Sequence, residues 1–214
     1  MCNTKAGEKT SLIVFACSHM LILLGAVGLS KLFFDFSSNF VSFVLSLILY
    51  IVFANLPVFL YVGIRDKSNI FSFFKLREKA IKGILIGLVI GLFISAIFFA
   101  VNRFKFSESI NIRRDVWLII GTALVGMLEE IPFRGFYLQK LERHTGFLVA
   151  NIISSVMFAL LHVVMLLGSG GNVTMQLVLL FVISLWFGYI FKRTNSLWAV
   201  AIAHAIYNLA IYFL

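Results

Sequence analysis

The sequence predicts an all-α membrane protein, a polytopic bundle of about seven transmembrane helices, with an eighth left open. Two observations carry this prediction: 61% of the 214 residues are hydrophobic, and only 13% are charged. A soluble domain has about 25% charged residues, so this chain cannot cover a soluble surface with polar groups. Disorder is excluded by the same composition. Residues 1–214 are therefore expected to form a single integral membrane domain.

Uncharged stretches supply most of the expected spans, since crossing a bilayer takes roughly 20 residues. They lie at Ser11–Leu29, Val41–Ile64, Gly83–Val101, Thr145–Phe191 and Ser196–Leu214. The fourth stretch has 47 residues and contains the turn-like run Gly168–Asn172, so it predicts two helices. The first stretch is longer than a usual signal-peptide core and is expected to be a retained helix. Six spans follow from these stretches.

A seventh span is expected to begin at Val116. Its uncharged part, Val116–Leu128, has only 13 residues, so the helix must continue through the charged run Glu129–Arg134. Seven spans with a cytoplasmic N-terminus place 13 of the 18 Lys and Arg residues inside, as the positive-inside rule requires. Only the basic loop Arg103–Arg114 opposes this orientation. The net charge of +9 is thus explained by membrane topology, and no nucleic-acid partner is expected.

Two patterns have structural interpretations. Gly83, Gly87 and Gly91 recur every four residues, a spacing that lets membrane helices pack closely. Residues 71–82 mix Phe with Lys and Arg, which predicts an amphipathic segment along the membrane interface.

Ionisable residues deep in a span cost several kcal/mol and are functional candidates by default. Those of this chain are Glu129, Glu130, Arg134, His162, His204 and His19, and the uncharged Asn151 and Asn208 accompany them. His19 has no matching partner and is expected to be structural.

Three of the candidates are expected at one depth. In a hairpin that turns near Gly146, Glu129 lies 17 residues before the turn and His162 lies 16 residues after it. At about 1.5 Å per residue the two reach nearly the same height. His204 lies eight residues into the last span, also near the middle of the membrane.

Helical spacing groups the remaining candidates. Three pairs lie four residues apart and therefore share a face: Glu130 with Arg134, Phe158 with His162, and His204 with Asn208. Pro132 frees the carbonyl of Leu128 from its helical hydrogen bond, which predicts a kink beside the carboxylates.

Water activation is the chemistry that needs this set. A carboxylate beside an imidazole can take a proton from water and return it to a leaving amine, while Asn and His can hold an oxyanion. Alternatively, Glu129, His162 and His204 could bind zinc. Each group alone also has a structural explanation: Glu130–Arg134 as a buried ion pair, and each histidine as a hydrogen-bonded core residue.

These motifs, Glu129-Glu130-x-x-x-Arg134, Phe158-x-x-x-His162 and His204-x-x-x-Asn208, resemble the signature of the CPBP (Abi) family. These are the CAAX-protease and bacteriocin-processing intramembrane proteases, which include the Ras-converting CAAX prenyl endopeptidase. The motif-bearing core would cover about residues 115–214.

The resemblance implies an all-α fold with a cytoplasmically open intramembrane cavity, and hydrolysis of peptide bonds. By motif position, Glu129 would be the general base and His162 would orient water. His204 and Asn208 would stabilise the oxyanion, and Glu130, Arg134 and Phe158 would support the site. The family is often labelled metalloprotease, but a glutamate-activated water with no cofactor is the favoured mechanism here, and zinc stays open.

The small size resembles bacterial members, which are associated with bacteriocin self-immunity, peptide maturation or regulated proteolysis. The resemblance therefore also implies a location in a bacterial cytoplasmic membrane. The expected partners are membrane lipid and a peptide or membrane-anchored protein substrate. Two other functions stay open. A proton-coupled transporter also uses buried Glu and His, and a non-catalytic immunity or scaffold protein would bind a peptide without cleaving it.

Overall fold

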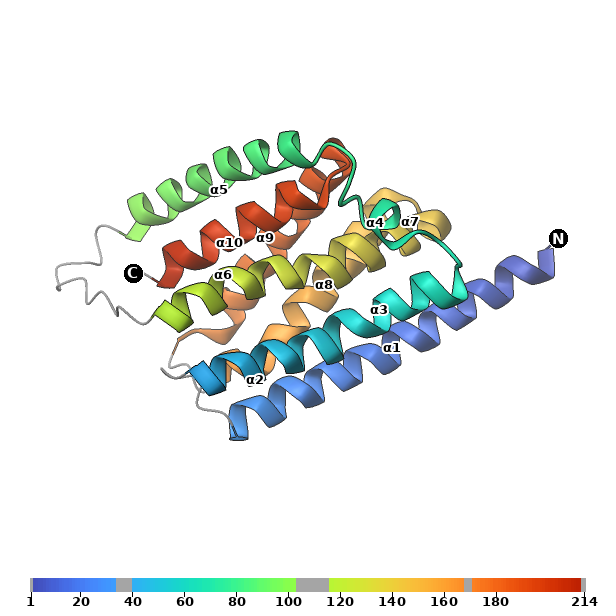
Figure 1. Ribbon diagram of the computed structural model, residues 1–214, viewed down its shortest axis with the longest axis horizontal. Coiled ribbons are helices and arrows are strands. Elements are labelled where there is room, and N and C mark those ends of the chain that lie inside the picture. Colours follow the sequence, from blue (N-terminus) through green and yellow to red (C-terminus); the bar gives the residue numbers. More distant parts are fainter. Residues whose placement is uncertain (1, 34–39, 103–115, 168–170, 213–214) are drawn as a thin grey trace.

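The computed structural model describes residues 2–33, 40–102, 116–167 and 171–212, and every regular element among them is helical (Figure 1). The α-helices and three π-helices (η) follow in this order: α1 Cys2–Phe33, α2 Phe40–Tyr50, η1 Ile51–Asn55, α3 Leu56–Leu60, η2 Tyr61–Arg65, α4 Ile70–Phe73, α5 Ala80–Asn102, α6 Val116–Glu130, η4 Ile131–Leu138, α7 Gln139–Thr145, α8 Phe147–Leu166, α9 Val173–Thr194 and α10 Leu197–Tyr212.

The expected all-helical membrane fold is confirmed. Six helical stretches are long and apolar enough to cross a membrane: Gly7–Gly28, Phe40–Arg65, Ala80–Ala100, Val116–Thr145, Phe147–Leu166 and Val173–Thr194. The stretch from Leu197 to Ile211 is apolar but shorter. The span expected at Val116 does run through the charged cluster. The loop Arg103–Arg114 and residues 168–170 lie outside the described residues.

The helices lie side by side along the long axis of the molecule (Figure 1). α10 contacts both α5 and α6, and α8 contacts both α1 and α9. The packing expected for the glycine repeat is confirmed at the α5–α10 contact. A Cβ added at Gly87 would lie 2.8 Å from the Ala199 carbonyl, and one at Gly91 would lie 2.8 Å from Ile206 Cβ.

A proline interrupts the second span. Pro57 has no N–H, so the Phe53 carbonyl four residues earlier loses its helical donor. His19 Nε2 donates to that carbonyl at 2.8 Å, and its Nδ1 accepts from the Tyr137 hydroxyl at 2.5 Å. The structural role expected for His19 is confirmed, because both ring nitrogens are paired inside the protein.

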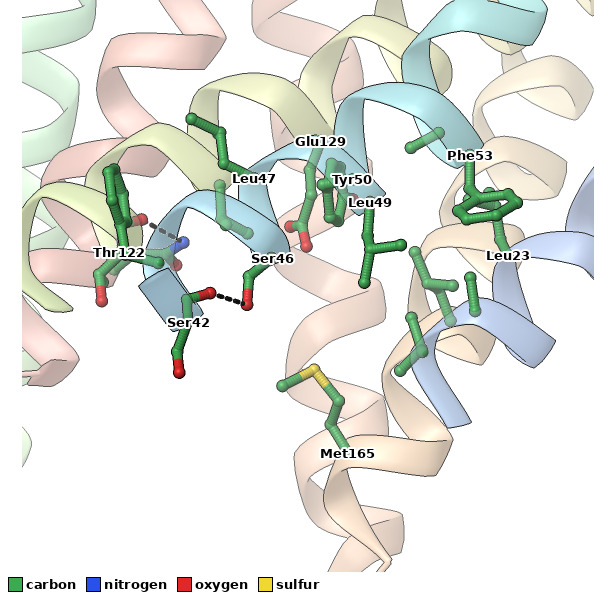
Figure 2. A pocket seen from close by; sticks show the side chains of 18 of the residues that line it. Leu23, Ser42, Ser46, Leu47, Leu49, Tyr50, Phe53, Thr122, Glu129 and Met165 are labelled. Carbon is green, nitrogen blue, oxygen red and sulfur yellow. Dashed lines mark hydrogen bonds between the residues drawn. The ribbon is translucent and has the colours of Figure 1, made fainter. Parts of the chain in front are cut away.

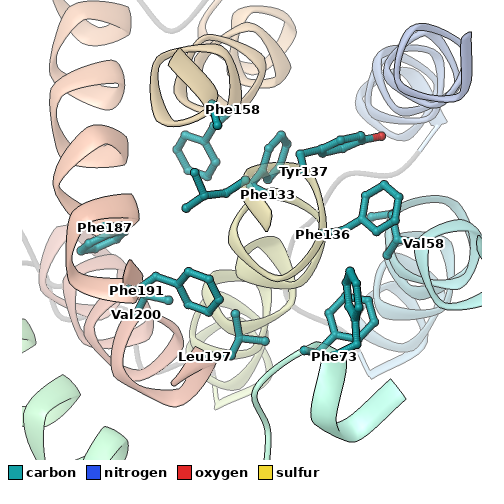
Figure 3. Packing of buried hydrophobic residues seen from close by; sticks show 14 of the residues in the cluster. Val58, Phe73, Phe133, Phe136, Tyr137, Phe158, Phe187, Phe191, Leu197 and Val200 are labelled. Atoms are coloured by element: carbon teal, nitrogen blue, oxygen red, sulfur yellow. The ribbon is translucent and has the colours of Figure 1, made fainter. Parts of the chain in front are cut away.

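Pro132 interrupts the fourth span, directly after the two glutamates. The backbone continues as the π-helix η4, and its residues Phe133, Phe136 and Tyr137 are buried in an aromatic cluster (Figure 3). The Ser154 hydroxyl donates to the Phe133 carbonyl at 2.9 Å. Irregular backbone is tolerated at membrane depth only where protein covers it, and here it is covered.

The amphipathic segment expected along the membrane interface over residues 71–82 stays a prediction, and the structure shows that it is not one continuous helix. Only α4 and the first residues of α5 are helical there, and turns and bends lie between them. Phe73 and Phe74 point into the core, where Phe74 packs against Phe59 at 5.0 Å between ring centroids. Phe73 and Phe74 are therefore buried in the protein, whereas Phe71 is 56% exposed.

Candidate active site

The structure brings the three ionisable residues of equal expected depth together. Glu129 lies in the last turn of α6, His162 on α8 and His204 on α10. Glu129 Oε2 is 3.8 Å from His162 Nε2 and 3.6 Å from His204 Nε2. Two imidazoles from different helices therefore face one carboxylate oxygen.

The neighbouring Glu130 has a different environment. It is 0% exposed, and its Oε1 accepts from Arg134 at 3.0 Å and from His204 Nδ1 at 2.7 Å. Arg134 also donates to the carbonyl and hydroxyl of Ser184 on α9, at 3.0 and 2.8 Å. A buried arginine is stable only with such partners. This cluster therefore ties α6, η4, α9 and α10 together beneath Glu129.

Two aromatic rings enclose the cluster. The Arg134 guanidinium lies 4.7 Å from the Phe158 ring centroid and 5.6 Å from that of Phe187. The same two rings lie 5.7 and 5.5 Å from the His204 ring. Cation–π contacts of this kind stabilise a desolvated guanidinium and hold the imidazole in place.

His162 is oriented by its own helix. Its Nδ1 is 2.8 Å from the Phe158 carbonyl, one turn earlier. A carbonyl can only accept, so Nδ1 carries the proton and the Nε2 of a neutral ring is an acceptor. That acceptor faces Glu129, which leaves a place for a water molecule bonded to both.

A cavity of about 330 Å³ opens beside these residues, between α1, α2, α6, α8 and α10 (Figure 2). Its walls are mainly apolar. The lining includes Glu129, His162 and Asn208, but neither Glu130 nor His204. Of the two adjacent carboxylates, Glu129 is thus the one that a molecule in the cavity would meet.

Asn208 stands at the close contact of α6 with α10. Its amide nitrogen is 3.5 Å from the Thr122 carbonyl, at the limit of a hydrogen bond. A Cβ added at Gly126 would lie 3.0 Å from the same nitrogen. The second uncharged residue considered, Asn151, lies away from the site and donates to the Leu185 carbonyl on α9 at 2.9 Å.

The residues present do not match a metal centre. In the described part of the chain, no group of three His, Cys, Asp or Glu side chains is arranged to hold a metal ion. The nearest set is Glu129 with His162 and His204, whose facing atoms are separated by the distances given above. We therefore derive no step through zinc.

Three residues of the site escaped the sequence analysis: Tyr50, Ser184 and Phe187. Ser184 and Phe187 lie on α9, which carries no ionisable residue at this depth. Ser184 and Phe187 are three residues apart and therefore share one face of the helix. This spacing alone does not indicate a site, because serine and phenylalanine are common in membrane helices. Tyr50 lies in the half of the chain without motifs.

Known proteins are similar to the C-terminal half of this chain, which also contains most of the candidate active site. Residues 111–210 match the family described as type II CAAX prenyl endopeptidase Rce1-like. A Bacillus subtilis (strain 168) protein named "Putative membrane peptidase YdiL" is 32% identical over 92 residues, which are 42% of this chain and 34% of that protein. The chain thus spans about a third of the curated relative that it matches. No solved structure matches it.

Proposed function

We propose that the chain is an intramembrane endopeptidase of the Rce1-like type II CAAX prenyl endopeptidase (CPBP) family, whose model matches residues 111–210. One observation carries the proposal: the Glu129 carboxylate lies in the cavity wall with two imidazole nitrogens facing it. This is the arrangement that a base-activated water requires.

In the proposed reaction, a water molecule donates one hydrogen to Glu129 and the other to Nε2 of His162. Hydrogen bonds of about 2.6–3.2 Å to both groups would fix it. Glu129 removes one proton as the water oxygen bonds to the scissile carbonyl carbon, and the carbonyl π electrons move to its oxygen. The carbon–nitrogen bond then breaks, and Glu129 returns the proton to the leaving amine. The products are a carboxylic acid and an amine.

The tetrahedral oxyanion needs donors in a site from which bulk water is excluded. His204 donates through Nδ1 to the Glu130 carboxylate, and in the proposed reaction its ring carries a second proton on Nε2, which donates to the oxyanion. The Asn208 amide is held only weakly by Thr122 and can turn to the oxyanion. Hydrogen-bond donors that already point toward the oxyanion stabilise it more strongly in such a site than they would in water.

Glu130 and Arg134 support the reaction without touching the substrate. Arg134 balances the charge of Glu130, so that His204 lies beside a neutral pair. Phe158 covers both Arg134 and His204. This explains why the two adjacent carboxylates can have different tasks, Glu129 as base and Glu130 as anchor.

The cavity supports a substrate with apolar side chains or an apolar anchor. Leu23 on α1, Phe43 on α2 and Phe53 on η1 belong to its wall, and Met165 on α8 lines it as well. The reacting peptide bond would lie where this apolar space meets Glu129 and His162. Membrane-associated peptides and proteins fit this description.

Isotope labelling tests the proposed function. Purified protein in proteoliposomes is incubated with a synthetic pool of apolar peptides in H₂¹⁸O, and the products are analysed by mass spectrometry. The proposal predicts new C-termini that each carry one ¹⁸O from the attacking water. Intact peptides throughout, with ion-dependent uptake or tight peptide binding instead, would favour the transporter or the non-catalytic partner.

A further inference from the structure

Resting on the proposed function, we propose that Tyr50 is a further catalytic residue, whose phenol donates a hydrogen bond to the oxyanion of the tetrahedral intermediate. Tyr50 is the last residue of α2, outside the three motifs and outside the matched region 111–210. The observation behind the proposal is a buried hydroxyl that has no hydrogen-bond partner among the described residues.

The hydroxyl belongs to the candidate active site. Tyr50 lines the same cavity as Glu129, His162 and Asn208, and Figure 2 shows its ring beside the Glu129 carboxylate. The charged groups that act on this hydroxyl are Glu129 and, after it, Glu130. Glu129 is near enough to act on this hydroxyl as an acceptor, but the two groups do not reach the geometry of a formed hydrogen bond, so the phenol proton can turn to a bound substrate.

The backbone holds Tyr50 in this place. The π-helix η1 begins at the next residue, and His19 fixes its Phe53 carbonyl from α1. Toward the start of α2, Ser42 and Ser46 lie on the same helical face as Tyr50, and all three residues line the cavity (Figure 2). These hydroxyl-bearing residues, four apart, form a polar line in an otherwise apolar wall, and Tyr50 is the end nearest Glu129.

An unpartnered buried hydroxyl is costly, because folding removes it from water without replacing the lost hydrogen bond. The Tyr50 ring packs against the core, but its hydroxyl adds nothing to the stability of the free protein. It does gain a partner when a negatively charged oxygen forms beside Glu129. The other acceptor within reach, Glu129, is needed as the base, so the oxyanion is the partner that the reaction supplies.

Tyr50→Phe tests the role, because it removes the oxygen and retains the ring. With the apolar peptide pool in proteoliposomes, we expect kcat to fall about 10²–10³-fold, as for loss of one oxyanion donor. KM and the pH profile should change little, since Glu129 remains the base. The Tm should stay close to that of wild type, because the hydroxyl makes no hydrogen bond of normal geometry in the free protein.

Two further tyrosines provide matched controls. Tyr189→Phe, on the exposed part of α9, should leave both rate and Tm unchanged. Tyr137→Phe removes the hydrogen bond to His19 Nδ1 and should lower the Tm. Only Tyr50→Phe should lose rate without losing stability.

The possible failures are distinguishable. If wild type hydrolyses the peptides, Glu129→Gln does not, and Tyr50→Phe retains the full rate, the role of Tyr50 is wrong and the proposed function stands. A Tm that falls together with the rate would mean a structural role and also overturn the inference. If wild type itself hydrolyses none of the peptides, the proposed function fails and the inference fails with it.

Discussion

His204 donates a hydrogen bond from Nδ1 to Glu130 Oε1 across 2.7 Å, joining the last helix of the bundle to the end of α6. The same oxygen accepts from Arg134 at 3.0 Å. A histidine on one motif is thereby oriented by a carboxylate on another. The opposite ring nitrogen is left facing Glu129, where the proposed chemistry takes place.

Glu130→Gln should destabilise the protein strongly. The amide carries no charge, so Arg134 would remain buried without its ion pair, which costs about 3–5 kcal/mol. We expect a markedly lower Tm in detergent, together with loss of hydrolysis. The matched control is Glu142→Gln, which breaks the exposed ion pair with Lys192 and should cost about 0–1 kcal/mol. Equal Tm values for the two variants would contradict the anchoring role of Glu130.

His19→Leu should affect stability rather than chemistry. It leaves the Phe53 carbonyl and the Tyr137 hydroxyl buried and unpaired, at about 1–3 kcal/mol for each group. We expect a lower Tm, with most of the hydrolysis rate retained well below it. Cys17→Ser, at an exposed position on the same helix, is the control. A variant with normal stability and no hydrolysis would place His19 in the reaction instead.

Gly126→Ala should reduce the rate of hydrolysis. The added methyl group would lie 3.0 Å from the Asn208 amide and 3.1 Å from the Ala205 nitrogen, so α6 and α10 must separate slightly. A small displacement of a catalytic group costs on the order of 10–100-fold in rate. Gly25→Ala, where nothing lies within 4 Å, should have no such effect. Similar rates for both variants would show that this close contact is unimportant.

Chelators should not inhibit hydrolysis. The proposed water is activated by Glu129 and His162, so incubation with 1,10-phenanthroline should leave the initial rate unchanged. Elemental analysis of the purified protein provides an independent readout and should find no stoichiometric zinc. Inhibition that is reversed by added zinc would contradict this mechanism and favour the zinc alternative.

The sequence was sufficient for the fold class and for most of the site, because both depend on local patterns. Span length identified the helices, and four-residue spacing placed Phe158 with His162 and Glu130 with Arg134. Glu129 and His162 were expected at the same depth because they lie almost equally many residues from the turn of one helical hairpin. Each of these inferences needs only helical geometry and the thickness of a bilayer.

The site residues that could not be predicted depend on which helices become neighbours in the folded bundle. Nothing in residues 40–65 shows that Tyr50 will face Glu129, since α2 could turn another face to the bundle. Ser184 and Phe187 contact Arg134 only because α9 lies against η4. Phe73 and Phe74 are buried through contacts with other helices, which the periodicity of residues 71–82 does not specify. The cytoplasmic location of the N-terminus stays a prediction.

The most direct test of the central claim is the hydrolysis rate of Glu129→Gln in proteoliposomes, measured with the apolar peptide pool. Exposed Glu78→Gln is its control, and the Tm of each protein reports folding. The account predicts no detectable hydrolysis by Glu129→Gln at wild-type Tm, with full activity in the control. Hydrolysis by Glu129→Gln at the wild-type rate would show that another group activates the water.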